Sequence, residues 1–156
     1  MADTGIRGFY LVMQNIKDTL LANQDVNTVT TGDITEIDLD KQTIFPLSHI
    51  ILNNVLGQEN TLTFNISVLA MDIVDENKDA VTDKFVGNNN EQDILNTQLA
   101  VLNNLLQKLR FGVLQRNGYE IVGDASIEPF YERFENRLAG WAATFDVMIA
   151  NDIEIC

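Results

Sequence analysis

Two stretches of the chain carry apolar residues at helical spacing, and the first lies near its beginning. Thr4 is placed to cap a helix there, and Asn23 and Asp25 mark its end. Apolar residues recur at every third or fourth position between these limits. This spacing predicts a helix with one apolar stripe, formed by Ile6, Phe9, Met13, Ile16 and Leu20 and widened by Tyr10 and Leu21.

The second helical stretch follows a polar segment that runs from Asp75 to Asn90. Asn90 is placed to cap this helix and Gly112 to end it, while Lys108 and Arg110 suit the negative end of its dipole. A continuous apolar line predicts its buried side: Ile94, Leu95, Leu99, Leu102, Leu106 and Leu109.

Strict alternation of apolar and polar residues marks a strand from Leu62 to Ala70. A denser apolar run from Phe45 to Leu56 precedes it, and residues 57–60 (Gly-Gln-Glu-Asn) form a good turn between the two. The two runs together predict a long β-hairpin. Towards Ile73 both faces become apolar, so we expect that end of the strand to be covered on both sides.

The last part of the chain predicts a second hairpin. Its first strand runs from Ile127 to Phe134 and contains Pro129, which favours an edge or bulged position. After a turn near Asn136 and Arg137, the closing strand carries one apolar face: Trp141, Ala143, Phe145, Val147 and Ile149. Its other face is small and polar, a surface on which a neighbouring subunit can pack: Gly140, Ala142, Thr144 and Asp146.

Residues 26–42 read as short extended pieces with a turn near Gly32 and Asp33. The expected order is therefore helix, short strand, long hairpin, helix, long hairpin. We predict an α+β fold, a mostly antiparallel sheet built from two long hairpins with two amphipathic helices packed on one face. Residues 1–156 form a single domain in this interpretation, as their length also suggests.

Composition narrows the class of protein. The chain has 10 basic and 23 acidic residues, a formal charge of −13, which argues against a classical nucleic-acid binder. The charge fits a highly soluble protein, and equally the wall of a conduit along which DNA slides without sticking. Apolar runs are short and the first residues lack a signal-peptide pattern, so we expect a cytosolic product with no membrane contact.

The residues that could carry chemistry lack the neighbours that chemistry needs. His49 has no recognisable nucleophile or orienting carboxylate near it in sequence, which favours a structural histidine in a strand. Glu128 and Glu132 read as exposed charges, and no basic residue stands near Cys156 to activate its thiol. This single cysteine also excludes an internal disulfide and a Cys-rich zinc site.

The segment from Asp75 to Ala80 places oxygen ligands at alternate positions, as a calcium loop does. The EF-hand pattern, however, requires Gly where Ala80 stands and Glu where Val86 stands, so a solvated acidic loop is preferred. No glycine-rich phosphate loop is present. We assign no catalytic, cofactor-binding or metal-binding residue and expect no cofactor and no enzymatic activity.

The element order and three stretches of sequence resemble the tail-terminator, or tail-completion, proteins of long-tailed bacteriophages. The stretches are residues 45–50 (Phe-Pro-Leu-Ser-His-Ile), residues 62–72, which close on Asp72, and residues 140–147, which begin Gly-Trp-Ala. The helix from Gln92 to Leu109 also corresponds. The resemblance covers nearly the whole chain and is one of pattern rather than of an invariant motif.

The resemblance implies a structural virion protein in the tail or neck. It implies a homo-oligomer, a hexameric ring, that caps the tail-tube protein, stops polymerisation of the tube and joins the tail to neck and connector proteins. DNA passes through the lumen without specific binding, and no active site is expected. The polar loop then becomes the candidate contact with the tube or neck, through Asp75, Glu76, Lys78, Asp79, Asp83 and Lys84.

Three alternatives stay open at the level of sequence. The nearest is another ring of the phage neck, a head-completion or connector protein. A small cytosolic enzyme or ligand-binding domain would instead have a concave pocket with convergent polar groups. A monomeric adaptor would offer one sheet edge to another protein.

Overall fold

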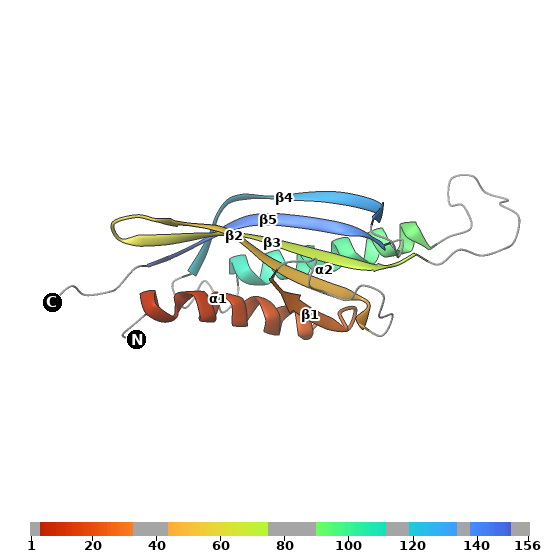
Figure 1. The fold of residues 1–156 in the computed structure, drawn as a ribbon, viewed down its shortest axis with the longest axis horizontal. Coiled ribbons are helices and arrows are strands. Elements are labelled where there is room, and N and C mark those ends of the chain that lie inside the picture. Colours follow the sequence, from red (N-terminus) through yellow and green to blue (C-terminus); the bar gives the residue numbers. More distant parts are fainter. Residues whose placement is uncertain (1–3, 33–43, 75–89, 112–118, 134–137, 151–156) are drawn as a thin grey trace, which may run out of the picture.

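The computed structural model describes residues 4–32, 44–74, 90–111, 119–133 and 138–150 (Figure 1). Its elements are two helices and five strands: α1 (Thr4–Leu21), β1 (Thr28–Thr31), β2 (Leu47–Gly57), β3 (Thr61–Ile73), α2 (Glu91–Phe111), β4 (Tyr119–Arg133) and β5 (Leu138–Ala150). The strands form one sheet in the order β1-β2-β3-β5-β4. The fold is therefore α+β, as predicted.

The sheet is mixed, which corrects one part of the predicted architecture. Both expected hairpins are present, since β2 pairs with β3 and β4 with β5 in antiparallel fashion. β1, however, runs parallel to β2, with Thr28 opposite Leu47 and Thr31 opposite Ile50. Parallel neighbours, unlike the strands of the two hairpins, cannot be joined by a tight turn.

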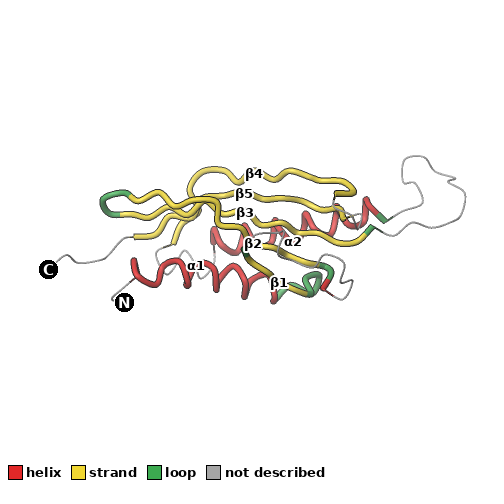
Figure 2. Tube along the Cα trace, viewed as in Figure 1, coloured by secondary structure: helices red, strands yellow, loops and turns green. Residues whose placement is uncertain are grey.

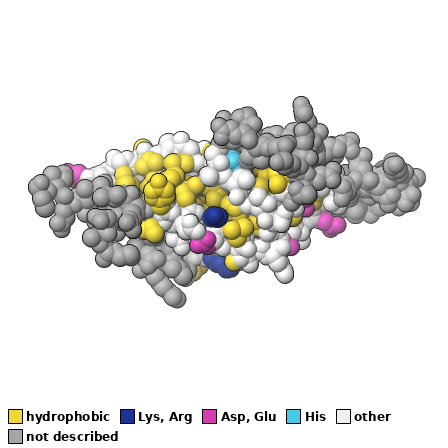
Figure 3. Space-filling view, turned by 60° about the horizontal axis from the view of Figure 1, so that its bottom comes forward, with side chains coloured by type: hydrophobic (Ala, Val, Ile, Leu, Met, Phe, Trp, Pro, Cys, Tyr) yellow, Lys and Arg dark blue, Asp and Glu magenta, His cyan; other side chains and the backbone are white. Residues whose placement is uncertain are grey.

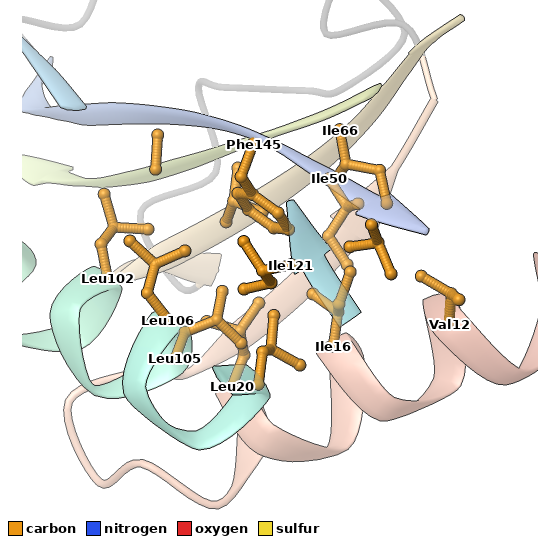
Figure 4. Packing of buried hydrophobic residues seen from close by; sticks show 14 of the residues in the cluster. Val12, Ile16, Leu20, Ile50, Ile66, Leu102, Leu105, Leu106, Ile121 and Phe145 are labelled. Carbon is orange, nitrogen blue, oxygen red and sulfur yellow. The ribbon is translucent and has the colours of Figure 1, made fainter. Parts of the chain in front are cut away.

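Both helices lie on the same side of the sheet (Figure 2). The alternation in β3 and β5 is confirmed, because their predicted apolar faces turn towards the helices and form the main core. Figure 4 shows side chains from α1, α2 and the sheet meeting around Phe145, among them Ile16, Leu105 and Ile121. Full burial of each such side chain contributes about 1.5–3 kcal/mol, so this layer supplies most of the stability.

The apolar stripe of α1 differs from the prediction, because Phe9 is 39% exposed and Val12, which the prediction left out, is buried. Val12, Ile16 and Leu20, each four residues apart, are fully buried. Tyr10 and Leu21, expected to widen the stripe, are 74% and 45% exposed, so that expectation is wrong. Residues four apart form a single line along a helix, and partly buried Leu11 and Met13 pack against the core beside it.

The second helix buries most of the predicted line, although Leu99 is only half-buried. The amide of Ile94 donates to the carbonyl of Asn90 at 3.0 Å, so Asn90 stands at the beginning of the helix as predicted. Leu95 is only half-buried, but its carbonyl accepts a 2.7 Å hydrogen bond from the indole Nε1 of Trp141, which ties α2 to β5. Gln98, a polar residue outside the predicted line, is fully buried.

The sheet is covered on both sides near the end of β3, as the sequence predicted. Val74, Ile94 and Ala139 pack together on the helix side. A second cluster lies on the other side of the sheet and consists of Phe45, Leu47, Met71, Phe130 and Leu138. Ile44, Leu69 and Ile73 are partly buried and pack against this cluster.

Gly140 sits under this second cluster, opposite Met71 of β3. A Cβ at this position would overlap the carbonyl oxygen of Ala70 and lie 2.8 Å from the Cα of Met71. The glycine therefore lets β3 and β5 approach closely.

Candidate assembly surfaces

Among the described strands, one edge of the sheet is only half occupied. β1 pairs with β2 up to Ile50, and none of the described strands pairs with the rest of β2 on that side. Residues 51–57 are called here the free β2 edge, because none of the described strands takes up their backbone N–H and C=O groups on that side. In Figure 1 the β2–β3 hairpin containing this edge ends beyond both helices, at the left of the molecule.

The free β2 edge is uncharged and partly apolar. Asn53 and Asn54 are exposed, and Val55 and Leu56 are 42% and 58% exposed. The first acidic residue is Glu59 in the turn, where Thr61 Oγ1 donates to Gln58 Oε1 at 2.8 Å. An unpaired edge with exposed aliphatic side chains is a template for pairing with another chain.

The opposite edge, β4, has a different character. Its exposed residues include Glu120, Asp124 and Glu128, so Glu128 is an exposed charge as predicted. Pro129 lies in this edge strand, also as predicted. The register shifts twice along β4, and Gly123 between the shifted pairs has a φ of +72°. The strand begins at Tyr119, eight residues before the predicted Ile127, because these irregularities hide its alternation.

The face of the sheet away from the helices carries a hydrogen-bonded polar row. Asn53 Nδ2 donates to Asn65 Oδ1 and to Ser67 Oγ, both at 2.8 Å. Asn65 Nδ2 in turn donates to Asp146 Oδ1 at 2.8 Å, and the hydroxyls of Ser67 and Thr144 lie 2.9 Å apart. These bonds link β2, β3 and β5 and hold the small polar face of β5, predicted from sequence, in a fixed arrangement.

A groove of about 400 Å³ lies between α1 and the β1 side of the sheet. Its lining combines apolar and polar side chains: Tyr10, Met13, Gln14, Lys17, Val29, Thr30, Thr31 and Ile50. Figure 3 looks onto this side of the molecule, where hydrophobic side chains gather beside a basic one. Thr31 and Ile50 are the last β1–β2 pair, so the groove lies where the free β2 edge begins.

Lys17 is the only cation of the groove lining. It is exposed, and none of the described residues forms a hydrogen bond or ion pair with it. The neighbouring Asp18 accepts a 2.8 Å hydrogen bond from Gln14 Nε2 instead. The ammonium group therefore faces solvent at the rim of an otherwise largely neutral groove.

His49 lies in β2 and is fully buried, in agreement with the structural role predicted for it. Its Nε2 donates to the carbonyl of Gly32 at 2.8 Å, and its Nδ1 lies 2.8 Å from Thr30 Oγ1. The carbonyl can only accept, so in the neutral ring Nδ1 accepts the Thr30 proton. The imidazole thus fastens β1 to β2 at the end of their pairing.

The loop residues predicted as assembly contacts lie outside the described part of the chain: Asp75, Glu76, Lys78, Asp79, Asp83 and Lys84. The calcium-like segment 75–80 and Cys156 lie outside it too. Within the described ranges no group of three or more His, Cys, Asp or Glu side chains is placed to hold a metal ion. Neither described helix is long and apolar enough to cross a membrane.

Sequence reasoning did not identify the free β2 edge or the groove. Val55 and Leu56 belong to an apolar run that reads as core, and Tyr10 lies beside the apolar stripe of α1. One signal was available: the Val55–Leu56 pair comes directly before the turn predicted at residues 57–60. Comparison with protein-family models and with curated proteins finds no match to this chain.

Proposed function

We propose that this chain is a self-assembling ring subunit of the tail-terminator kind. In this role it caps the tail tube of a long-tailed phage, stops polymerisation of the tube and joins the tail to the neck. The observation that carries the self-assembly is the free β2 edge with exposed Val55 and Leu56. The pattern resemblance of the sequence supplies the phage context.

The difference between the sheet edges supports assembly with a defined direction. An open edge recruits a partner, whereas an edge carrying charges, proline and bulges resists one. A subunit with both kinds of edge forms one specific contact instead of adding strands without limit. When such a contact joins two different patches, its repetition closes into a ring if the rotation per subunit allows.

The acidic charge supports the second part of the proposal. With a net charge of −13, a ring of several copies has a strongly negative field. DNA moving through its lumen is repelled from the wall and is not trapped by it. Subunit contacts must then be strong enough to overcome the repulsion between copies, which requires buried apolar area on the order of 1,000 Å².

The proposal is tested on the purified full-length chain by light scattering coupled to size exclusion, native mass spectrometry and negative-stain microscopy. We expect annular particles with a central hole and six subunits. A monomer at all accessible concentrations would overturn the proposal. Twelve subunits would instead assign the chain to a connector ring of the neck.

The capping role has its own test in a virus that carries the gene. Without a cap, nothing stops the tube from growing beyond its normal length. We therefore expect deletion of the gene to give overlong, headless tails, measured by electron microscopy of lysates. Headless tails of normal length would place the chain at the joint with the head and contradict the capping role.

A further inference from the structure

We propose that neighbouring subunits are joined by insertion of one β2–β3 hairpin end into the α1–β1 groove of a second copy. The inserted part comprises Val55, Leu56 and the turn that contains Glu59. This inference rests on the self-assembly proposed above and names the two surfaces that meet. The occupant of the groove is therefore the same polypeptide and not a small molecule.

The apolar parts of the two surfaces match. The groove offers partly buried Met13 and Val29 together with the exposed ring of Tyr10. Val55 and Leu56 are the exposed aliphatic side chains of the hairpin end, on opposite faces of β2. A volume of about 400 Å³ is enough for side chains of this size, and it lies within the roughly 300–1,000 Å³ of ordinary binding pockets.

The charges match as well. Lys17, Lys108 and Arg110 are the basic residues whose side chains the structure describes, in a chain with a net charge of −13. Arg110 Nη2 donates to the carbonyl of Gly123, whereas Lys17 stands unpaired at the groove among the described residues. Glu59 is an exposed acid at the hairpin turn, also without a partner in the described part of the chain. Two acidic copies repel each other, so a contact that places a carboxylate against this cation is favoured over contacts between acidic surfaces.

The positions of the surfaces also suit the contact. The groove is lined by Thr31 and Ile50, the last β1–β2 pair, so a hairpin entering it lies beside the start of the free β2 edge. Backbone hydrogen bonds along residues 51–57 then become available to the incoming strand. The groove, the Lys17–Glu59 charge pair and the free β2 edge can therefore all bind the same incoming hairpin.

Charge reversal tests the contact. Lys17→Glu and Glu59→Lys should each raise the concentration for half-assembly on the order of tenfold, because each places two like charges together. Combining both substitutions in one chain restores opposite charges, and we expect it to recover most of the loss. Lys108→Glu, an exposed cation of α2 changed in the same way, is the matched control and should leave assembly unchanged. Circular dichroism checks that each variant is folded.

The outcomes separate this inference from the proposed function. If the single variants assemble as well as the wild type, or if the combined variant does not recover assembly, the hairpin-in-groove contact is overturned. The proposal that the chain forms a ring is not affected by either result. A closed dimer with the same charge dependence upholds the contact, with each hairpin filling the other copy's groove, and overturns the ring. A wild-type chain that stays monomeric overturns both.

Cross-linking gives a second measurement that does not depend on charge. In a Cys156→Ser background, a chain with Leu56→Cys is mixed with one carrying Gln14→Cys and treated with a short bis-maleimide. We expect a cross-linked pair of the two different chains. Gln107→Cys, at an exposed position of α2, is the control partner and should give none. Equal cross-linking to both partners would overturn the proposed contact.

Discussion

β4 and the free β2 edge lie towards opposite edges of one sheet, and they differ in the features that protect unpaired backbone groups from other strands. β4 has acidic side chains, a proline and two register shifts, with Gly123 in a left-handed conformation at one of them. The free β2 edge has a single bulge, between Leu52 and Asn54, and no charge before Glu59. Features like those of β4 prevent edge-to-edge aggregation in soluble proteins. Residues 51–57 share only the bulge with β4 and carry no charge or proline, which is why we propose that this edge is the one occupied in the assembly.

The positions of both edges depend on the pairing of β3 with β5 in the middle of the sheet. Gly140→Ala places a Cβ against the carbonyl oxygen of Ala70, inside backbone that cannot move aside without separating the strands. We expect a loss of about 3 kcal/mol or more in the free energy of unfolding. Urea denaturation followed by circular dichroism measures it.

Ala142→Ser is the control for Gly140→Ala. It adds one small atom on the same face of the same strand, where Ala142 is half-buried. We expect a change within about 0.5 kcal/mol. Equal losses for the two variants would show that the close approach at Gly140 is not what limits the sheet.

A matched pair of valines tests the two edges directly. Val55 on the free β2 edge and Val122 on β4 are each 42% exposed. Val55→Glu puts an unpaired charge into the proposed contact, which should weaken assembly about 100-fold or more, or about 2.8 kcal/mol. Val122→Glu should leave assembly unchanged. Sedimentation velocity at several concentrations measures both, and equal effects would contradict the assignment of different roles to the edges.

The acidic charges that protect β4 from pairing with other strands can also be removed by substitution. Changing Glu120 and Glu128 to Thr and Asp124 to Asn moves the net charge from −13 to −10, since three negative charges are lost. We expect new, open-ended association at high concentration, because an uncharged edge recruits strands. Light scattering and thioflavin fluorescence over time detect it.

The control for β4 removes the same charge elsewhere. Asp18, Asp25 and Asp93 are exposed residues outside the sheet, and changing all three to Asn gives the same net charge. This variant should remain as soluble as the wild type. Aggregation of both variants would mean that net charge, and not the edge, keeps the chain in solution.

Local periodicity predicted the parts of the fold that depend on local spacing. The alternation from Leu62 to Ala70 gave the correct buried face of β3, and the apolar line from Ile94 to Leu109 located α2. The parallel pairing of β1 with β2 could not be read in this way, because alternation states which face is buried and not which strand lies alongside. The start of β4 was missed because Gly123 and Asp124 interrupt its pattern.

The candidate surfaces were harder to predict than the fold. An exposed Val55 and a buried Ile50 look alike in sequence, since both belong to one apolar run. Val55 is exposed although its cross-strand partner Phe64 is buried, because none of the described strands lies alongside β2 beyond Ile50. Tyr10 was expected to be buried for the same reason, and it instead lines the rim of the groove.

The smallest expected changes in stability come from replacing one glycine of each edge strand by alanine. Gly123 has a φ of +72°, and a Cβ added there would meet no atom within 4 Å, so Gly123→Ala adds conformational strain without a clash, about 1–2 kcal/mol. At Gly57, which ends β2, a Cβ meets only Leu62 Cδ2 at 3.9 Å, so Gly57→Ala should be neutral or stabilise by about 0.4–1 kcal/mol.

Both glycine variants are compared in the Val55→Glu background, so that unfolding is measured on a monomer and assembly does not contribute. Urea denaturation midpoints should move in opposite directions, or Gly57→Ala should stay in place while Gly123→Ala falls. A loss at Gly123 alone would show that the left-handed conformation at this register shift of β4 requires a glycine. Equal losses of unfolding free energy at both positions would mean that the end of β2 needs a glycine as much as β4 does.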